Sequence, residues 1–242
     1  MSRPRDVYSR HEWLSFTATA RRAHGPTSLS APSPTPIFRF LHVDNLGVCL
    51  SRGSLSAPLH SPSDVHTYKT IHNVEIQEQR SAKLLPCGPR GVIHDYVAFY
   101  FGPRSPMLYQ LHTGWVPGYT EGQAPLVYVV TTAQAVAASG CGFVFSDGHG
   151  IARFTSWFDD LRDLDKVDWD AVYARMWRDT VDDMDRQRRK QAEFLVHRGC
   201  DWGLIHEIGV LNGAAKARAE QVLAGFPPVL HRPVQVRPEW YY

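Results

Sequence analysis

One acidic side chain stands in a segment whose other residues predict a buried strand. Residues 192–196 are apolar except for Glu193. Alternation along a strand places Glu193 on one face with Leu195 and the other three apolar residues on the opposite face. A carboxylate among apolar residues costs free energy unless a partner or a function stabilises its charge. Two interpretations stay open on pattern alone: a structural ion pair with the basic residues 188–190, or a catalytic carboxylate.

A cluster of basic residues at 186–190 follows an acidic stretch at 182–185. Such a charge run is typical of a solvated helix face, and contact with phosphates is the alternative. The formal net charge of +2 does not decide between them. A dedicated electrostatic nucleic-acid binder usually carries a larger basic excess.

The common catalytic and metal-binding motifs are missing from this sequence. It has no G-x-x-x-x-G-K-[ST] phosphate loop, no G-x-G-x-x-G after a strand, no H-E-x-x-H and no G-x-S-x-G. His60, His66 and His72 are spaced six residues apart, which matches no common pattern of metal ligands. We therefore expect no metal site.

The cysteines and the hydropathy pattern indicate the compartment. The four cysteines are widely separated and form no C-x-x-C pair, which favours free thiols in a reducing environment. No segment approaches the roughly 20 apolar residues that a membrane helix needs. We expect a cytoplasmic protein that does not span a bilayer.

The 242 residues, 43% of them hydrophobic, are enough for one substantial core. Residues 1–36 differ from the rest because they contain five Pro and six Ser and no apolar periodicity. Their five Arg and two acidic residues give a faint likeness to a transit peptide. We interpret them as a flexible leader, or an over-long start, before one domain at 37–242.

The domain mixes predicted strands and helices without a regular β-α-β order, so the sequence predicts an α+β fold. Asp44 and Asp168 are candidate helix N-caps, and Gly53 and Gly225 follow helix ends. Residues 56–73 predict a long loop. Strands are expected at 37–42, 92–101, 107–111, 126–130, 143–145, 192–196, 204–211 and 234–240, and helices at 45–52, 133–138, 154–164, 169–177 and 214–224.

Several sequence blocks together resemble one known family. The segment 188–196, RRKQAEFLV, is similar to the catalytic segment of the DarT family, the DNA ADP-ribosyltransferase toxins of bacterial toxin–antitoxin pairs. Further similar blocks occur in the same order: HVDNL at 42–46, GVIHDYV at 91–97, FYFGPRSPMLY at 99–109, FVFSDGH at 143–149 and the ending WYY. The likeness runs from about Ile37 to the C-terminus.

The resemblance implies an ADP-ribosyltransferase fold with a split, mixed β-sheet core, surrounding helices and a cleft for NAD as co-substrate. Glu193 matches the catalytic glutamate, and Arg80, in IQEQR, matches a catalytic arginine. The segment 61–82 would close over NAD, and 149–193 would recognise the substrate. Cofactor-contacting positions would be Arg39, Phe40, Leu41, Val48, Ser56 and Arg80, and substrate-binding candidates are His149, Arg153 and Arg178.

The chain departs from some relatives in the strand that would line the nicotinamide pocket. Some family members have histidine where this chain has Arg39, and a hydroxyl-bearing residue where it has Leu41. Other members carry arginine at the first of these positions. Arginine there is therefore compatible with activity.

The implied chemistry suits these residue types. Breaking the nicotinamide–ribose bond builds positive charge on the ribose, which a carboxylate such as Glu193 can stabilise. A base nitrogen that carries a proton is a poor nucleophile until that proton is removed. Arginine normally stays protonated, so we assign Arg80 to phosphate contact and to the deprotonated base, with Glu193 assisting proton transfer. An ordinary surface ion pair is the alternative for Arg80.

The sequence thus predicts a toxin-like enzyme that moves ADP-ribose from NAD onto a base of single-stranded DNA, with thymine favoured over guanine. A cognate macrodomain antitoxin would be its protein partner. RNA or protein as the acceptor remains an alternative. So does a silent module that binds NAD and nucleic acid without turnover.

Overall fold

The computed structural model describes residues 29–242. Most of the expected leader therefore lies outside the described residues. Its last part, 29–36, leads directly into the first strand. There the backbone of Thr35 accepts a hydrogen bond from the Ala133 amide at 2.9 Å and donates one to the Gln134 side chain at 2.8 Å. These contacts fix where the chain enters the sheet.

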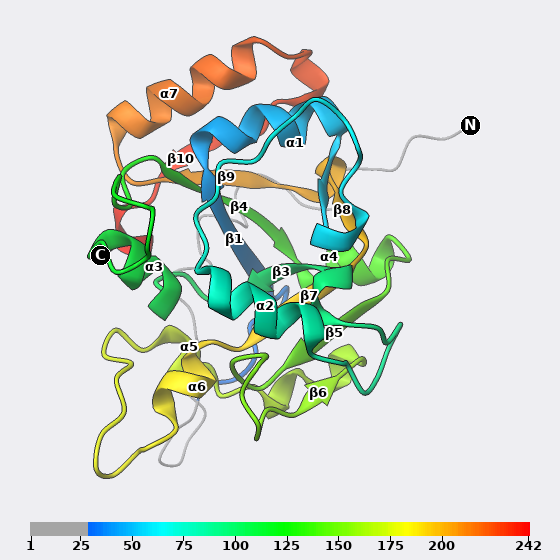
Figure 1. The fold of residues 1–242 in the computed structure, drawn as a ribbon, viewed down its shortest axis with the longest axis vertical. Coiled ribbons are helices and arrows are strands. Elements are labelled where there is room, and N and C mark those ends of the chain that lie inside the picture. Colours follow the sequence, from blue (N-terminus) through cyan, green and yellow to red (C-terminus); the bar gives the residue numbers. More distant parts are fainter. Residues whose placement is uncertain (1–28) are drawn as a thin grey trace.

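An eight-stranded sheet forms the centre of the molecule (Figure 1). All neighbouring strands are antiparallel except β10 and β9, which are parallel, so the sheet is mixed, as expected. In spatial order the strands are β10 (Val234–Val236), β9 (Glu207–Val210), β4 (Leu126–Thr132), β1 (Pro36–His42), β3 (Tyr96–Tyr100), β7 (Glu193–His197), β5 (Phe143–Ser146) and β6 (Trp157–Phe158). A second, two-stranded sheet consists of β2 (Ser54–Ser56) and β8 (Gly199–Asp201).

The large sheet is split between β1 and β3. Strand β1 pairs with β4 along its whole length, and β3 pairs with β7 along its whole length. Between β1 and β3 the register joins Phe38 to Tyr100, at one end of the two strands. The backbones therefore diverge from that point, which confirms the split core that the family resemblance implies.

The helices surround this sheet, and their ends follow the expected capping chemistry with one correction. They are α1 (Leu46–Arg52), α2 (Val74–Ala82), α3 (Pro106–His112), α4 (Ala133–Ala138), α5 (Trp169–Tyr173), α6 (Arg186–Lys190) and α7 (Gly213–Ala224). Asp168 caps α5 by accepting from the Ala171 amide, and Gly53 ends α1 in the left-handed conformation. Asp44 is not a cap: its own amide donates to His42 Nδ1 at 3.1 Å, in the 3₁₀ turn before α1.

Two expected elements have the wrong type. Residues 107–111 form helix α3 and not a strand, because the Ser105 hydroxyl accepts from the Leu108 amide and Pro106 occupies the first helical turn. Residues 154–164 do not form one helix. Phe158 instead pairs with Phe145 in strands β6 and β5, where their rings stack with centroids 5.3 Å apart. A 3₁₀ helix, Leu161–Lys166, follows.

Other elements are shorter than expected. A 3₁₀ turn, Ile93–Asp95, precedes β3, so the strand predicted from 92 begins at Tyr96. Helix α5 ends at Tyr173 because the backbone of Ala174 leaves the helical region, with ψ at 134°. Trp177 therefore lies outside the helix, and its indole N–H donates to the Tyr242 hydroxyl at 2.7 Å. The strands predicted at 204–211 and 234–240 contract to β9 and β10.

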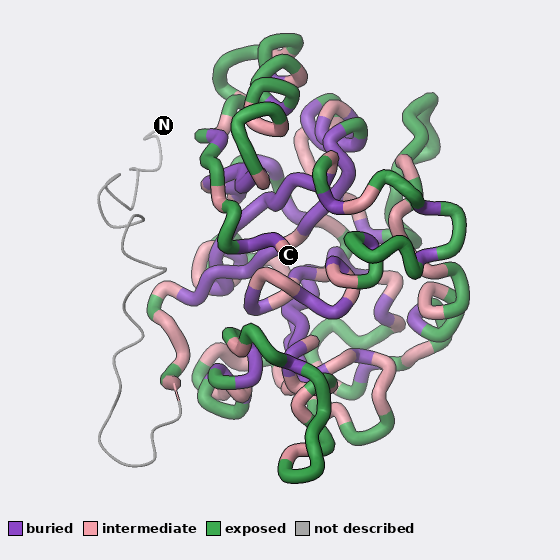
Figure 2. Tube along the Cα trace, turned by 90° about the vertical axis from the view of Figure 1, so that its left-hand side faces the viewer, coloured by how far each residue is buried: buried purple, intermediate pink, exposed green. Residues whose placement is uncertain are grey.

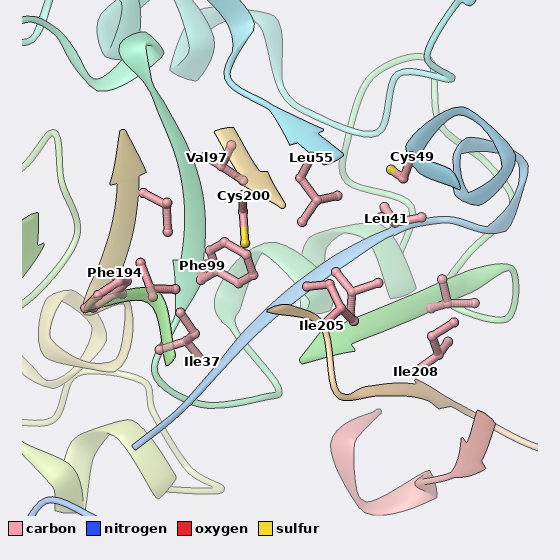
Figure 3. Close-up of a cluster of buried hydrophobic side chains, with 14 of the residues drawn as sticks. Ile37, Leu41, Cys49, Leu55, Val97, Phe99, Phe194, Cys200, Ile205 and Ile208 are labelled. Atoms are coloured by element: carbon pink, nitrogen blue, oxygen red, sulfur yellow. The ribbon is translucent and has the colours of Figure 1, made fainter. Parts of the chain in front are cut away.

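The core lies on both faces of the sheet. Phe194 packs with Ile37 and Phe99 in the main apolar cluster, where side chains of β1, β3 and β7 meet (Figure 3). Leu195 faces the opposite side and packs in a smaller cluster with Ile93. The alternation expected for 192–196 is therefore confirmed. Figure 2 shows buried backbone running through the centre of the molecule and exposed segments around it.

Candidate active site

A cavity of about 750 Å³ opens where the large sheet splits. Its walls come from both half-sheets and from the helices beside them. Strand β1 contributes Arg39, Phe40 and Leu41, and the second half-sheet contributes Tyr100 and Glu193. Because strand divergence exposes side chains that a continuous sheet would cover, this position suits a buried binding site.

Glu193 and Arg80 form a buried ion pair on the wall of this cavity. Arg80 donates from its two terminal nitrogens to the two carboxylate oxygens, at 2.9 and 2.7 Å. The Gly150 amide donates to one of the same oxygens at 2.9 Å. Glu193 is 2% exposed and Arg80 is 8% exposed. The surface ion pair considered as the alternative for Arg80 is therefore wrong. So is the alternative that Glu193 pairs with one of residues 188–190.

Both members of this pair keep their charge at neutral pH. Burial alone would raise the pKa of Glu193, but the charge and hydrogen bonds of Arg80 outweigh it and hold the pKa below its usual value. Burial likewise opposes the charge of Arg80, and Glu193 raises the pKa of Arg80 above its ordinary value. A carboxylate that faces a cavity in ionised form can stabilise positive charge that develops on a bound ligand.

Local structure explains how these two side chains meet. Glu193 begins β7, directly opposite Tyr100 of β3. Arg80 lies in the last turn of α2, a helix that Asn73 caps by accepting from the Ile76 amide at 3.2 Å. The two partners are 113 positions apart in the sequence, and the segment between them contains β4 of one half-sheet and β3, β5 and β6 of the other. The pair is therefore a product of the tertiary fold.

Arg39 links the two half-sheets across the split. Its side chain is half-buried, and the guanidinium donates to the Ala98 carbonyl of β3 at 2.8 Å. Burial lowers its pKa below the ordinary value of arginine, with a smaller contribution from the charge of Arg80 in the same direction. Two cationic side chains thus stand near one cavity, which suits a ligand that carries negative charge.

His149 also lines the cavity, near the carboxylate of Glu193. Burial lowers the pKa of His149 below its ordinary value of 6.5, although the charge of Glu193 partly opposes this shift. The imidazole is therefore neutral at pH 7 and offers one donor and one acceptor. Its backbone amide donates to the Arg188 carbonyl at 2.9 Å, which ties this loop to α6.

The structure brings most, but not all, of the expected residues to this cavity. Ser56 lines it together with the three residues of β1, and residues 68–73 of the expected closing segment form another wall. Val48 is buried in α1 and is not part of the lining. Arg153 and Arg178 lie outside the lining, beside the rings of Phe154 and Tyr109.

Sequence reasoning missed several cavity residues, and Tyr100 is one of them. It stands opposite Glu193 in the sheet, and its ring stacks against Phe40 with centroids 6.3 Å apart. Burial raises the pKa of the Tyr100 hydroxyl, so it stays protonated. The block FYFGPRSPMLY contains this residue, but only the register of β3 against β7 shows that it faces Glu193.

The basic run at 186–190 is not the solvated helix face that its composition predicts. Arg188 pairs with Asp147 at 2.8 Å and with Asp185 at 2.7 Å, and Arg189 pairs with Asp168. Lys190 is 5% exposed. The run therefore anchors α6, and with it the start of β7, to surrounding loops.

The part of the chain that the structure covers contains no helix that is both long enough and apolar enough to cross a membrane. Within residues 29–242, no three His, Cys, Asp or Glu side chains are arranged to hold a metal ion. The four cysteines are free thiols.

Comparison with known proteins places this geometry in one family. A family model described as "ssDNA thymidine ADP-ribosyltransferase, DarT" matches residues 38–242. A DNA ADP-ribosyl transferase of Thermus sp. (strain 2.9) is 40% identical over 211 residues, which span 87% of this chain and 98% of that protein.

Solved structures agree with this assignment. Thermus sp. 2.9 DarT in complex with ADP-ribosylated ssDNA matches with a TM-score of 0.83 and 39% identity, over 89% of this chain and 100% of that chain. The same protein in complex with NAD⁺ matches with a TM-score of 0.78 and 38% identity, over 88% and 100% of the two chains. This chain belongs to the DarT family of ssDNA thymidine ADP-ribosyltransferases.

Proposed function

We propose that this chain transfers ADP-ribose from NAD onto a thymine of single-stranded DNA, with Glu193 and Arg80 as its catalytic residues. The observation that supports this best is the buried Arg80–Glu193 pair on the wall of a cavity of about 750 Å³, in a chain of this family. Related DarT structures contain NAD⁺ or ADP-ribosylated ssDNA.

The cavity residues fit NAD as a co-substrate. Arg39 and Arg80 supply positive charge for a diphosphate, and Phe40 offers an aromatic face to a ring. Leu41 and Ser56 complete the cofactor side of the site. Val48 is buried in α1 and does not line the cavity, so we assign it no contact with NAD.

The chemistry follows from the charges on the cavity wall. Bound NAD supplies the ADP-ribosyl group and loses nicotinamide as the leaving group. The ionised carboxylate of Glu193 stabilises the positive charge that builds on the ribose as that bond breaks. A ring nitrogen of the base forms the new bond and gives up its proton, which Glu193 helps to remove. Arg80 holds Glu193 in position and stabilises negative charge on the base.

On the acceptor side we assign His149, Arg153 and Arg178 to the DNA. Neutral His149 lies in the cavity near Glu193, where it can donate to or accept from a base edge. Arg153 and Arg178 are exposed and form no ion pair with another of the described residues, so each can contact a phosphate.

The acceptor can be tested with NAD labelled in its ADP-ribose part. Single-stranded DNA, the annealed duplex, RNA and protein are offered separately, and mass spectrometry locates the adduct. We expect labelling of thymine in single-stranded DNA and strong suppression in the duplex, because a paired base must first be extruded. Adducts only on guanine, RNA or protein would replace the proposed acceptor. Absence of any adduct would leave a binding module.

A macrodomain antitoxin is the partner that this chemistry calls for, since removal of the mark requires a domain that recognises ADP-ribose. We expect the chain to arrest bacterial growth when expressed alone and growth to recover when a cognate macrodomain is co-expressed. Recovery must require the macrodomain's own ADP-ribose site. The free cysteines fit the reducing cytoplasm in which such a toxin would act.

A further inference from the structure

A group of aromatic side chains lies together at the surface beside the cavity. Tyr109 and His112 come from α3, Trp115 from the following loop and Tyr242 from the end of the chain. We call these four residues the aromatic platform. The Tyr109 ring centroid is 5.1 Å from that of Tyr242 and 6.2 Å from that of Trp115, and His112 stacks on Tyr242 at 6.3 Å. The platform is accessible, since Trp115 is 67% exposed.

Hydrogen bonds to Tyr242 fix the position of its ring within the platform. The Tyr242 hydroxyl donates to the Arg104 carbonyl at 2.5 Å and accepts from the Trp177 indole at 2.7 Å. The Tyr242 backbone is paired with the Gln123 side chain, whose carbonyl accepts from the Tyr242 amide at 2.9 Å. A ring fixed before binding loses little freedom when a ligand stacks on it.

Two arginines lie against these rings with their charge uncompensated. The guanidinium carbon of Arg104 is 4.9 Å from the Tyr242 ring centroid, and that of Arg178 is 5.9 Å from that of Tyr109. Neither arginine forms an ion pair with a carboxylate within the described residues, in contrast to Arg188 and Arg189 of α6. Arginine between aromatic rings is the combination that contacts phosphates while bases stack.

The platform continues directly from the cavity rim. The Trp115 amide donates to the Gln110 carbonyl at 2.8 Å, and both Gln110 and the next residue, Val116, line the cavity. Met107, on the same helix as Tyr109, is also part of the lining. Figure 1 shows α3 beside the C-terminus. A strand whose target base enters the cavity would pass over these rings.

We propose that the aromatic platform binds nucleotides that flank the modified thymine in the same single strand. One flanking base stacks on Trp115, and Arg178 and Arg104 contact the adjoining phosphates. This proposal rests on the proposed function. The unpaired positive charge favours a nucleic-acid strand over an antitoxin surface, and the test separates these two ligands.

The experiment measures KM on a ladder of oligonucleotides. Each contains one target thymine and is extended by one nucleotide at a time, on its 5′ or its 3′ side. For the parent, KM should fall by about fivefold or more once the oligonucleotide is long enough to place a base on the platform. A fall of this size corresponds to the stacking of one base on an aromatic ring. The Trp115→Ala variant should lose this drop, and Trp115→Phe should retain most of it because the stacking face remains.

Charge is tested with Arg178→Ala and a matched control. Arg178→Ala should weaken binding of long strands and reduce the dependence of KM on salt, because one phosphate contact is lost. Lys216→Ala removes one positive charge from α7, where Lys216 pairs only weakly with Glu220 at 3.8 Å. That control should match the parent.

The outcomes separate the two claims. If the parent modifies no oligonucleotide, the proposed function fails. If it modifies them but KM for Trp115→Ala falls with strand length as in the parent, the platform proposal is overturned. It is also overturned if Trp115→Ala leaves the DNA ladder unchanged and instead abolishes binding of the antitoxin.

Discussion

At the scale of single residues, the site depends on two charges that are both removed from water. Arg80 and Glu193 satisfy each other with two short hydrogen bonds, and the Gly150 amide adds a third contact to the carboxylate. Removing one partner of such a pair leaves the other charge buried and uncompensated. The same arrangement that keeps Glu193 ionised for catalysis therefore also couples it to the stability of the fold.

Arg80→Met should lower the free energy of unfolding by about 3–5 kcal/mol at pH 7, because it strands the Glu193 carboxylate. Without Arg80, burial raises the pKa of Glu193, so the loss should shrink as the pH falls and the carboxyl group takes up a proton. The double variant Arg80→Met/Glu193→Leu should be more stable than Arg80→Met alone. Urea denaturation at pH 5 and pH 7 checks all three variants. Equal stability of the single and double variants would mean that the pair is not coupled.

At the scale of elements, the sequence predicts those segments whose pattern alone determines them. The strand 192–196 was predictable because its alternation matches the two faces that it buries, and α7 was predictable from its length and from Gly225 after it. Helix α3 was not predictable from its apolar residues, because five residues cannot separate a helix from a strand. The decisive signal was local: Ser105 and Pro106 start a helix.

The site itself shows the same limit. Glu193 is conspicuous from its apolar neighbours, whereas Arg80 stands in a polar helix and was found only through the family resemblance. Tyr100 faces Glu193 because of strand register, which is a property of the folded sheet. A hydropathy pattern therefore reveals a charged residue among apolar neighbours, but it does not reveal the residues that contact it in the folded protein.

Lys190 connects α6 to the C-terminal end of α5 and provides a second test at this scale. Its ammonium donates to the Val172 carbonyl at 2.6 Å and the Ala174 carbonyl at 3.1 Å. Burial lowers the pKa of Lys190 from 10.5 to about 7, with a smaller contribution from Arg104. In the unfolded chain the amine holds its proton up to its ordinary pKa. Between about pH 7 and 10.5 the unfolded state thus binds more protons, and folding becomes more favourable as the pH rises.

A comparison of the parent with Lys190→Met tests this pH dependence of stability. Between pH 7 and pH 9.5 the difference in unfolding free energy should move in the parent's favour by about 1–3 kcal/mol, from about 1.4 kcal/mol per pKa unit. Chemical denaturation at the two pH values measures it. A difference that does not change with pH would show that Lys190 keeps an ordinary pKa in the folded protein.

At the scale of the whole molecule, the split sheet is what makes a site possible. Strands β1 and β3 separate beyond the pair Phe38 and Tyr100. Arg39 of β1 spans the gap and donates a hydrogen bond to the Ala98 carbonyl of β3. The catalytic carboxylate, its arginine and the cofactor side of the cavity come from segments far apart in the sequence. They meet only when both half-sheets have formed.

The boundary of the domain follows from the contacts that precede β1. We propose that residues 1–28 are a leader that the domain does not need. Their deletion should leave the stability unchanged and the rate of DNA modification within a few-fold of that of the full chain. Deletion of residues 1–35 also removes buried Thr35 and its hydrogen bonds to Ala133 and Gln134, so it should cost about 1–3 kcal/mol more. Thermal melts and the DNA assay compare the two truncations. Loss of activity on removing only residues 1–28 would show that the leader belongs to the functional unit.

The central claim is that the charge of Glu193 acts in the transition state, and Glu193→Gln tests it most directly. The amide keeps the shape of the side chain and can still accept from Gly150, but it removes the negative charge. The matched control is Glu207→Gln. Glu207 is on β9 and forms a similar pair with Arg237 through two hydrogen bonds of 2.7 and 2.9 Å. This pair lies outside the cavity that Glu193 lines.

The measurement is kcat and KM for NAD on single-stranded DNA, with the folded state verified by circular dichroism. Glu193→Gln should lose stability, because Arg80 keeps a buried charge without its carboxylate partner. It should nevertheless stay folded, keep its KM for NAD within a few-fold and lose about a hundredfold or more in kcat. Glu207→Gln should lose stability and keep its kcat. Near-parental turnover by Glu193→Gln, or an equal loss of turnover in both variants, would contradict a catalytic role for the Glu193 carboxylate.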